Sequence, residues 1–301
     1  MRKPIRRTIA GAAIVTFALI ASACGSGGEE PTVTIGSANF SESALVAEIY
    51  AQTLEAEGYE VERKFNTGNR EIYAPALESG ELDLVPEYIG TILNYLGGTA
   101  STNSDETFVA LQAAWEPAGI QVLDYAPAQD KNGFAVTQAT ADSLGLSKVS
   151  DLAAVNGTLV LGGPPECPER QFCLEGLESV YGLEFAEFRP LDAGGPITVA
   201  ALEGDEIQVG LMFTSDGTIL AKGFVLLEDD KALQPSENIA PAVRSEIIDA
   251  YGDDFANALN AVSAKLTTTE LIVMNKLVGI DGQDPETVAA EWLKAIGVVS
   301  E

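Results

Sequence analysis

The chain has 301 residues, of which 46% are apolar and 21% charged, and this composition predicts a folded globular protein of one large or two medium-sized domains. Its 17 basic and 45 acidic residues give a formal net charge of −28, which argues against nucleic acid as a partner because phosphate binding requires basic patches. The sequence has no histidine and only three cysteines, so it excludes Ser-His-Asp and Cys-His catalysis, histidine metal ligands and a zinc site of four thiolates.

Residues 1–23 have the pattern of a secretory signal peptide. Four basic residues among the first seven precede an uncharged run of 16 residues, which is shorter than the roughly 20 residues that span a membrane as a helix. The run ends in Ala-Ser-Ala before Cys24 and resembles a bacterial lipobox, although Ala21 stands where that pattern prefers Leu. We expect a lipid on Cys24 and a flexible tether over residues 24–31, with cleavage after Ala23 by an ordinary signal peptidase as the alternative.

The segments after the tether alternate between strand and helix patterns. Alternating apolar residues predict strands over 32–35 and 59–65. Between them, Ser41 is expected to cap a helix that runs to about Glu57 and stops at Gly58. This alternation is typical of an α/β fold.

Several segments of the first half recur in the second half in the same order. Residues 76–88 (ALESGELDLVPEY) and 201–213 (ALEGDEIQVGLMF) both have the pattern of a helix end, an acidic Gly turn and a strand that ends in an aromatic residue. Two further pairs recur at nearly the same offset, 33–37 with 159–163 and 68–72 with 193–197. These repeats predict two lobes with the same βαβ plan.

Turn-rich segments at 126–133 and 234–238 predict two crossings between the lobes. We therefore expect lobe 1 over residues 32–132 plus 238–301 and lobe 2 over residues 133–237. Asp284-Pro285 is expected to start the last helix, which ends near Gly297. Ligands of parallel sheets bind beyond the carboxyl ends of the strands, so a cleft is predicted between the loops 36–41, 66–71, 162–172 and 192–197.

Cys167 and Cys173 remain if Cys24 carries a lipid. An even pair of cysteines in an exported protein predicts a disulfide that stiffens one loop. A redox pair is the less favoured alternative, because the spacing is not Cys-x-x-Cys.

The sequence resembles the osmoprotectant-binding family of ABC-transporter substrate-binding proteins, which capture glycine betaine, choline and related quaternary amines. The resemblance rests on GSANFSES at 36–43, AEIYAQTLEAEGYEVERK at 47–64, PALESGELDLVPEYIGT at 75–91 and GFVLLEDDKALQPSENIAPAVR at 223–244. It implies a two-lobe periplasmic-binding-protein fold of type II, with a mixed sheet flanked by helices in each lobe and two hinge crossings. The lobes are expected to close on the ligand and to dock on a permease.

The family holds a trimethylammonium group in an aromatic cage, because the face of an aromatic ring attracts a weakly hydrated cation. The resemblance places Tyr88 in this cage. Phe134 and Phe213 stand where the family has cage tyrosines, and Glu237 stands in the place of another. The cage is therefore depleted, and the alternative reading of the two phenylalanines is ordinary core packing.

Other candidate ligand contacts are polar groups of the predicted cleft. Asn39 and Phe40 follow the first strand, and Asn69 starts a helix whose N–H groups favour anions. Arg170 is a candidate donor to a ligand carboxylate, with a surface role as the alternative. Arg70 has Glu71 and Glu87 as candidate partners.

These expectations describe a binding protein with no catalytic residues, no cofactor and no metal site. Its partners are a small quaternary amine or zwitterion, the permease and ATPase subunits of an importer, and the outer face of the cytoplasmic membrane through the lipid anchor. Alternative functions are a receptor for another polar solute, such as an amino acid or a larger trimethylammonium compound like ergothioneine, and a sensor domain without transport. An enzyme is the least favoured reading, since no nucleophile–base motif is present.

Overall fold

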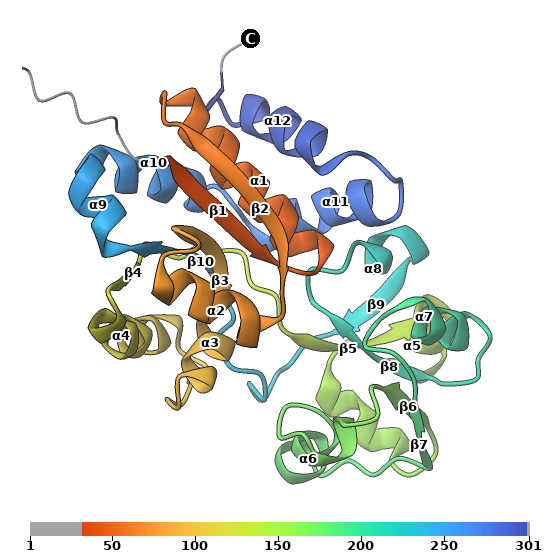
Figure 1. Cartoon of the computed structure of the whole chain (residues 1–301). Coiled ribbons are helices and arrows are strands. Elements are labelled where there is room, and N and C mark those ends of the chain that lie inside the picture. The colour runs from red at the N-terminus through yellow and green to blue at the C-terminus, as the bar shows by residue number, and fades with distance from the viewer. Residues whose placement is uncertain (1–31, 300–301) are drawn as a thin grey trace, which may run out of the picture. The chain divides into compact units, whose positions relative to one another are not determined.

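The computed structural model describes residues 32–299, which form two five-stranded mixed sheets flanked by helices (Figure 1). The predicted signal peptide, Cys24 and the tether lie outside the described residues. Within the described range, no helix is both long and apolar enough to cross a membrane.

The first sheet has the strand order β2-β1-β3-β10-β4. Strand β1 is parallel to β2 and β3, whereas β10 is antiparallel to both β3 and β4. We call this sheet and the helices around it the first lobe. Its strands are β1 (Val33–Ala38), β2 (Val61–Gly68), β3 (Leu84–Tyr88), β4 (Ile120–Val122) and β10 (Ile239–Arg244), and its helices are α1 (Ser41–Ala56), α2 (Arg70–Ser79), α3 (Ile89–Tyr95), α4 (Ser104–Trp115), α9 (Ser245–Tyr251), α10 (Asp253–Ser263), α11 (Thr268–Gly279) and α12 (Pro285–Ala295).

The second sheet has the order β7-β6-β8-β5-β9 and forms the second lobe. Strand β6 is parallel to β7 and β8, and β5 is antiparallel to β8 and β9. Its strands are β5 (Asn132–Thr137), β6 (Val160–Gly163), β7 (Glu187–Pro190), β8 (Val209–Phe213) and β9 (Phe224–Leu227), and its helices are α5 (Gln138–Leu144), α6 (Leu174–Gly176), α7 (Pro196–Glu203) and α8 (Gly217–Lys222). Short 3₁₀ turns cover Glu116–Ala118, Val149–Val155 and Cys167–Glu169, and a π turn covers Leu177–Tyr181.

The two sheets share one plan, which confirms the predicted two-lobe fold. The strands correspond in order: β1 with β6, β2 with β7, β3 with β8 and β10 with β5. The repeated sequence segments fall on these equivalent strands, since 76–88 ends in β3 and 201–213 ends in β8. In each lobe, the antiparallel strand inside the sheet directly follows a crossing segment. Strand β5 follows the first crossing and β10 follows the second.

Apolar side chains cover both faces of each sheet. In the first lobe, Val33, Ile35 and Leu84 point to a core shared with α1, α10, α11 and α12, while Val85 and Ala242 point to a core shared with α2, α3 and α4. In the second lobe, β5 contributes alternate residues to two such cores. Burial on both faces explains why a central strand such as β8 (VGLMF) is a nearly continuous apolar run, whereas the edge strand β2 (VERKFNTG) is largely polar.

Helix α1 begins one residue earlier than predicted. Ser41 is its first helical residue, and Phe40 occupies the N-cap with extended backbone and no capping side chain. The Ser43 hydroxyl instead accepts a hydrogen bond from the Ala38 N–H at 3.0 Å, and so fixes the turn between strand and helix. At the other end of the chain, Asp284 caps α12 as predicted by accepting from the Glu286 N–H at 3.0 Å.

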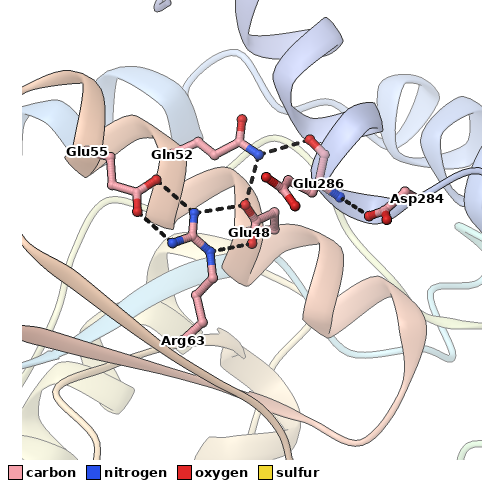
Figure 2. Close-up of polar contacts among 6 residues, drawn as sticks. All are labelled: Glu48, Gln52, Glu55, Arg63, Asp284 and Glu286. Carbon is pink, nitrogen blue, oxygen red and sulfur yellow. Dashed lines mark hydrogen bonds and ion pairs between the residues drawn. The ribbon is translucent and has the colours of Figure 1, made fainter.

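A polar network joins α1 to β2 and α12 (Figure 2). Arg63 of β2 donates to Glu48 at 2.8 and 3.0 Å and to Glu55 at 2.5 and 2.7 Å, both on α1. Gln52 bridges the Glu48 carboxylate and the backbone carbonyl of Glu286 at the start of α12. This network fixes the C-terminal helix on the first lobe.

The two crossing segments run beside each other. Gln129 and Asn238 form an antiparallel bridge, and the N–H of Asp130 donates to the carbonyl of Glu237 at 3.1 Å. The pairing places Asp130 and Glu237 next to each other, one on each crossing.

Candidate functional site

A cavity of about 990 Å³ lies beyond the carboxyl ends of β1, β3 and β8. This is the edge of a parallel sheet at which ligands bind, and α1, α7 and α8 begin there. Residues from both lobes line the cavity, and its walls also include Asp130 and Glu237 of the crossing segments.

Aromatic side chains from both lobes line this cavity, namely Phe40, Tyr88, Phe172 and Phe213. The Phe40 and Tyr88 rings lie 5.9 Å apart between centroids and are tilted by 36°. Tyr88 is only 7% exposed, whereas Phe40 is 43% exposed. Ring faces at such positions attract a cationic ligand.

Four of the residues predicted from the sequence line this cavity: Phe40, Tyr88, Phe213 and Glu237. Asn39 and Asn69 are exposed at the starts of α1 and α2 and are not part of its wall. Arg170 is exposed in the loop closed by the Cys167–Cys173 disulfide and is also absent from the wall.

Phe134 lies in the core of the second lobe and not in the cavity wall. It is 3% exposed and lies opposite Leu211 of β8 and Leu227 of β9. Side chains alternate between the two faces of β5, and this alternation directs the Phe134 ring into this core. Phe172, from the disulfide loop, lines the cavity; its place in the predicted cleft loop 162–172 was the signal that could have identified it.

Glu42, in the first turn of α1, is the most enclosed acidic group of the wall. It is 6% exposed, and it accepts hydrogen bonds from the Tyr88 hydroxyl at 2.6 Å and from the Asn275 amide at 2.5 Å. Burial raises the pKa of Glu42, while hydrogen bonds from Ser215, Tyr88 and Asn275 act in the opposite direction. Burial and the nearby Glu42 carboxylate also raise the pKa of the Tyr88 hydroxyl well above its usual value.

Asp130 and Glu237 add two further carboxyl groups to the wall. Burial raises the pKa of Asp130 well above its usual value, and the charge of Glu42 adds to this shift. Glu237 is 7% exposed and accepts from the Thr91 N–H at 3.0 Å and the Thr91 hydroxyl at 2.5 Å. Burial raises the pKa of Glu237 to about 7.

Arg70 lines the cavity, but its guanidinium is paired with the buried carboxylate of Glu87. Its Nε and Nη2 donate to the two oxygens of Glu87, each at 3.1 Å, so Glu87 and not Glu71 is its partner. Glu87 is fully buried and also accepts from the Tyr73 hydroxyl and from the N–H of Tyr88.

The arrangement therefore combines aromatic rings with carboxyl groups in one cavity, and this suits a bulky organic cation. Within residues 32–299, no group of three or more cysteine, aspartate or glutamate side chains is arranged to hold a metal ion.

Comparison with known proteins supports a solute-binding role for this cavity. The profile of a family described as the substrate binding domain of ABC-type glycine betaine transport systems matches residues 31–295. The glycine betaine-binding protein YehZ of Escherichia coli K12 is 29% identical over 283 residues, which cover 88% of this chain and 90% of YehZ. A glycine-betaine-binding protein of Pseudomonas aeruginosa is 30% identical over 275 residues, covering 87% of each chain.

Solved structures agree in fold. The crystal structure of a glycine betaine/carnitine/choline ABC transporter protein superimposes with a TM-score of 0.82 at 25% identity, covering 88% of this chain and 99% of the other. Apo YehZ from Escherichia coli superimposes with a TM-score of 0.77 at 28% identity, covering 89% and 99%. Because the family profile spans almost the entire described fold, including both lobes and the crossings between them, the chain belongs to the family of substrate-binding domains of ABC-type glycine betaine transport systems.

Proposed function

We propose that this protein is the extracytoplasmic receptor of an ABC importer and that it captures a quaternary amine, such as glycine betaine, in the cavity between its lobes. Members of the family bind solutes and are not enzymes. The lobes close around the ligand by a hinge motion at the paired crossing segments, and a permease with its ATPase then accepts the solute.

The observation that carries this proposal is the combination of Tyr88, Phe40, Phe172 and Phe213 with buried carboxyl groups in one cavity. A trimethylammonium group has no N–H to donate, so ring faces and nearby negative charge are the groups that can hold it. Relatives of this chain are named as glycine betaine-binding or carnitine transport binding proteins, which supports the same class of ligand.

Isothermal titration calorimetry of the purified protein against glycine betaine, choline, carnitine and ergothioneine tests the proposal, with proline as an amino acid outside the class. We expect binding heat with at least one trimethylammonium compound. Tyr88→Ala should weaken that binding about 2- to 30-fold, because one ring face contributes about 0.5–2 kcal/mol. Tyr95→Ala is the matched control, since Tyr95 is exposed and outside the cavity wall.

Two results contradict this proposal. One is the absence of heat with every trimethylammonium compound, whether or not proline gives heat. The other is a Tyr88→Ala protein that binds its ligand as tightly as the parent does.

We further propose that residues 1–23 are removed on export and that a lipid on Cys24 holds the protein at the outer face of the cytoplasmic membrane through residues 24–31. The sequence pattern before Cys24 supports this anchor. Expression of Cys24→Ala in a bacterial host should move the protein from the membrane fraction to the soluble exported fraction. An unchanged membrane fraction contradicts the lipid anchor.

A further inference from the structure

Each basic side chain that lines the cavity already has an acidic partner. Arg70 is bound by Glu87 through two hydrogen bonds of 3.1 Å. Lys222 contacts both oxygens of Glu203, at 2.9 and 3.1 Å. Within the described part of the chain, Arg70 and Lys222 are the basic residues of the wall, so the wall has no uncompensated positive charge for a ligand carboxylate.

The helix N-termini around the cavity are also occupied by the protein's own carboxylates. Glu237 accepts the N–H of Thr91 in the first turn of α3. Asp192 accepts the first N–H groups of α7, from Ile197 at 3.0 Å and Thr198 at 2.8 Å. At α8, Asp216 accepts the Thr218 N–H at 2.7 Å.

The N-terminus of α1 has its own negative charge, because Glu42 lies in the first turn. Helix N-termini otherwise attract anions. The basic side chains and helix N-termini that could hold a ligand carboxylate therefore already have acidic groups of this protein beside them.

Glu42 and Asp130 are carboxyl groups of the wall that no cation in the described part of the chain balances. None of the ion pairs among residues 32–299 includes either carboxylate. Their hydrogen bonds come from neutral donors: Ser215, Tyr88 and Asn275 donate to Glu42, and the Ser215 N–H donates to Asp130 at 3.3 Å. Two carboxyl groups in one poorly solvated place favour retention of a proton, because both charges together are unfavourable.

The charged groups around this pair come from several elements and do not change this conclusion. Asp216 raises the pKa of Glu42, and Glu237 raises the pKa of Asp130. On α11, next to Asn275, the Lys276 ammonium is paired with Asp281 at 2.6 Å.

Lys131 follows Asp130 in the chain but lines a separate cavity of about 250 Å³. Burial lowers the pKa of Lys131, and its nearby charges are Asp229 and Glu237. It therefore does not balance the Glu42–Asp130 pair by an ion pair.

We propose that Glu42 and Asp130 determine specificity within the quaternary amines: they favour a ligand of net charge +1 without a carboxylate, and this cation takes the place of a proton that one of these two wall carboxyl groups retains in the absence of ligand. This inference rests on the proposed function, and it names which members of the ligand class the cavity prefers. A cation such as choline gains attraction from both carboxylates. A zwitterion such as glycine betaine brings a carboxylate that is repelled by them and finds no unpaired basic group among the wall residues.

Proton exchange gives the binding a definite pH dependence. If a cation displaces one proton, its affinity rises with pH, by up to about tenfold per pH unit where the pair is protonated. Binding of a zwitterion displaces no proton from the pair, so its affinity stays flat with pH or falls. The sign of the pH dependence therefore separates the two ligand types.

The experiment is calorimetry with choline and with glycine betaine at about pH 6 and about pH 8, each in two buffers of different ionisation enthalpy so that proton release is counted. We expect choline to bind at least about tenfold more tightly than glycine betaine at the higher pH, with proton release and with an affinity that rises with pH. Asp130→Asn and Glu42→Gln should each reduce the preference for choline and abolish the proton release. Asp142→Asn, at an exposed position on α5, is the matched control and should leave both unchanged.

Circular dichroism checks that the variants fold, and the pH dependence of the parent protein tests the inference without any variant. Tighter binding of glycine betaine than of choline overturns the specificity proposal, and so does choline binding without proton release. Both results leave the proposed function intact. An absence of binding by every quaternary amine refutes the proposed function and this inference with it.

Discussion

Replacement of Arg70 by methionine tests how the wall of the cavity is held together. Glu87 is fully buried on β3, and within residues 32–299 Arg70 is the cation that forms an ion pair with it. The Arg70 side chain is 19% exposed, so the pair lies at the edge of the solvent-accessible space. Arg70→Met keeps most of the apolar stem and removes the charge.

The expected loss is large, because breaking a buried pair leaves an unbalanced charge inside the protein. Such changes lower the free energy of unfolding by about 3–5 kcal/mol, and the partial exposure of Arg70 favours the lower end of this range. The Tyr73 hydroxyl and the Tyr88 N–H remain as partners of Glu87 and limit the loss. The double variant Arg70→Met/Glu87→Gln should recover most of the stability, to within about 1 kcal/mol of the parent, since neither charge remains.

Urea unfolding followed by tryptophan fluorescence measures these differences. Trp115 and Trp292 both lie in the first lobe, as does the ion pair, so the signal reports the lobe that is perturbed. Lys276→Met is the control, because Lys276 and Asp281 form a pair that is more accessible to solvent than Arg70–Glu87, and surface pairs contribute at most about 1 kcal/mol. The reasoning is refuted if Arg70→Met unfolds at the same urea concentration as the parent, or if the double variant is no more stable than Arg70→Met.

Three further predictions concern packing, the disulfide and pH. A Cβ on Gly217 would lie 2.2 Å from the backbone nitrogen of Lys276, so Gly217→Ala should force α8 away from α11 and lower the free energy of unfolding by about 1–3 kcal/mol in urea titration; unchanged stability would show that the two helices separate easily. Cys167→Ser/Cys173→Ser should lower the free energy of unfolding by about 2 kcal/mol, and a reducing agent should have this effect on the parent alone; equal responses of parent and variant would contradict it. The pKa of Glu237 is raised from 4.5 to about 7, so its protonated form stabilises the fold below about pH 4.5 and this contribution is lost as the pH rises to about 7. Glu237→Gln should therefore gain stability relative to the parent over this range, by up to about 3 kcal/mol in urea titrations at several pH values, and a constant difference would argue against a raised pKa.

Local sequence patterns determined the strands, several helix ends and the repeated plan of the two lobes. Asp284-Pro285 starts a helix because its carboxylate accepts an N–H of the first turn, which depends on neighbouring residues alone. The start of α1 shows the limit of such patterns, since Ser41 has the right chemistry for a cap but Ser43 provides the hydrogen bond that shapes the turn.

The cavity required the tertiary structure. The partners of β5 in its sheet place Phe134 in the core, whereas Phe172, in the loop closed by the disulfide, lines the cavity. Glu42, Asp130 and Glu237 come from three distant segments of a chain with 45 acidic residues, so their spacing carries no signal. The sequence by itself determined local conformation and the α/β plan, because these depend on neighbours along the chain. The charge balance of the cavity was decided only when folding buried Glu42 and Glu237 and paired Arg70 with Glu87, because desolvation and pairing depend on contacts between distant residues.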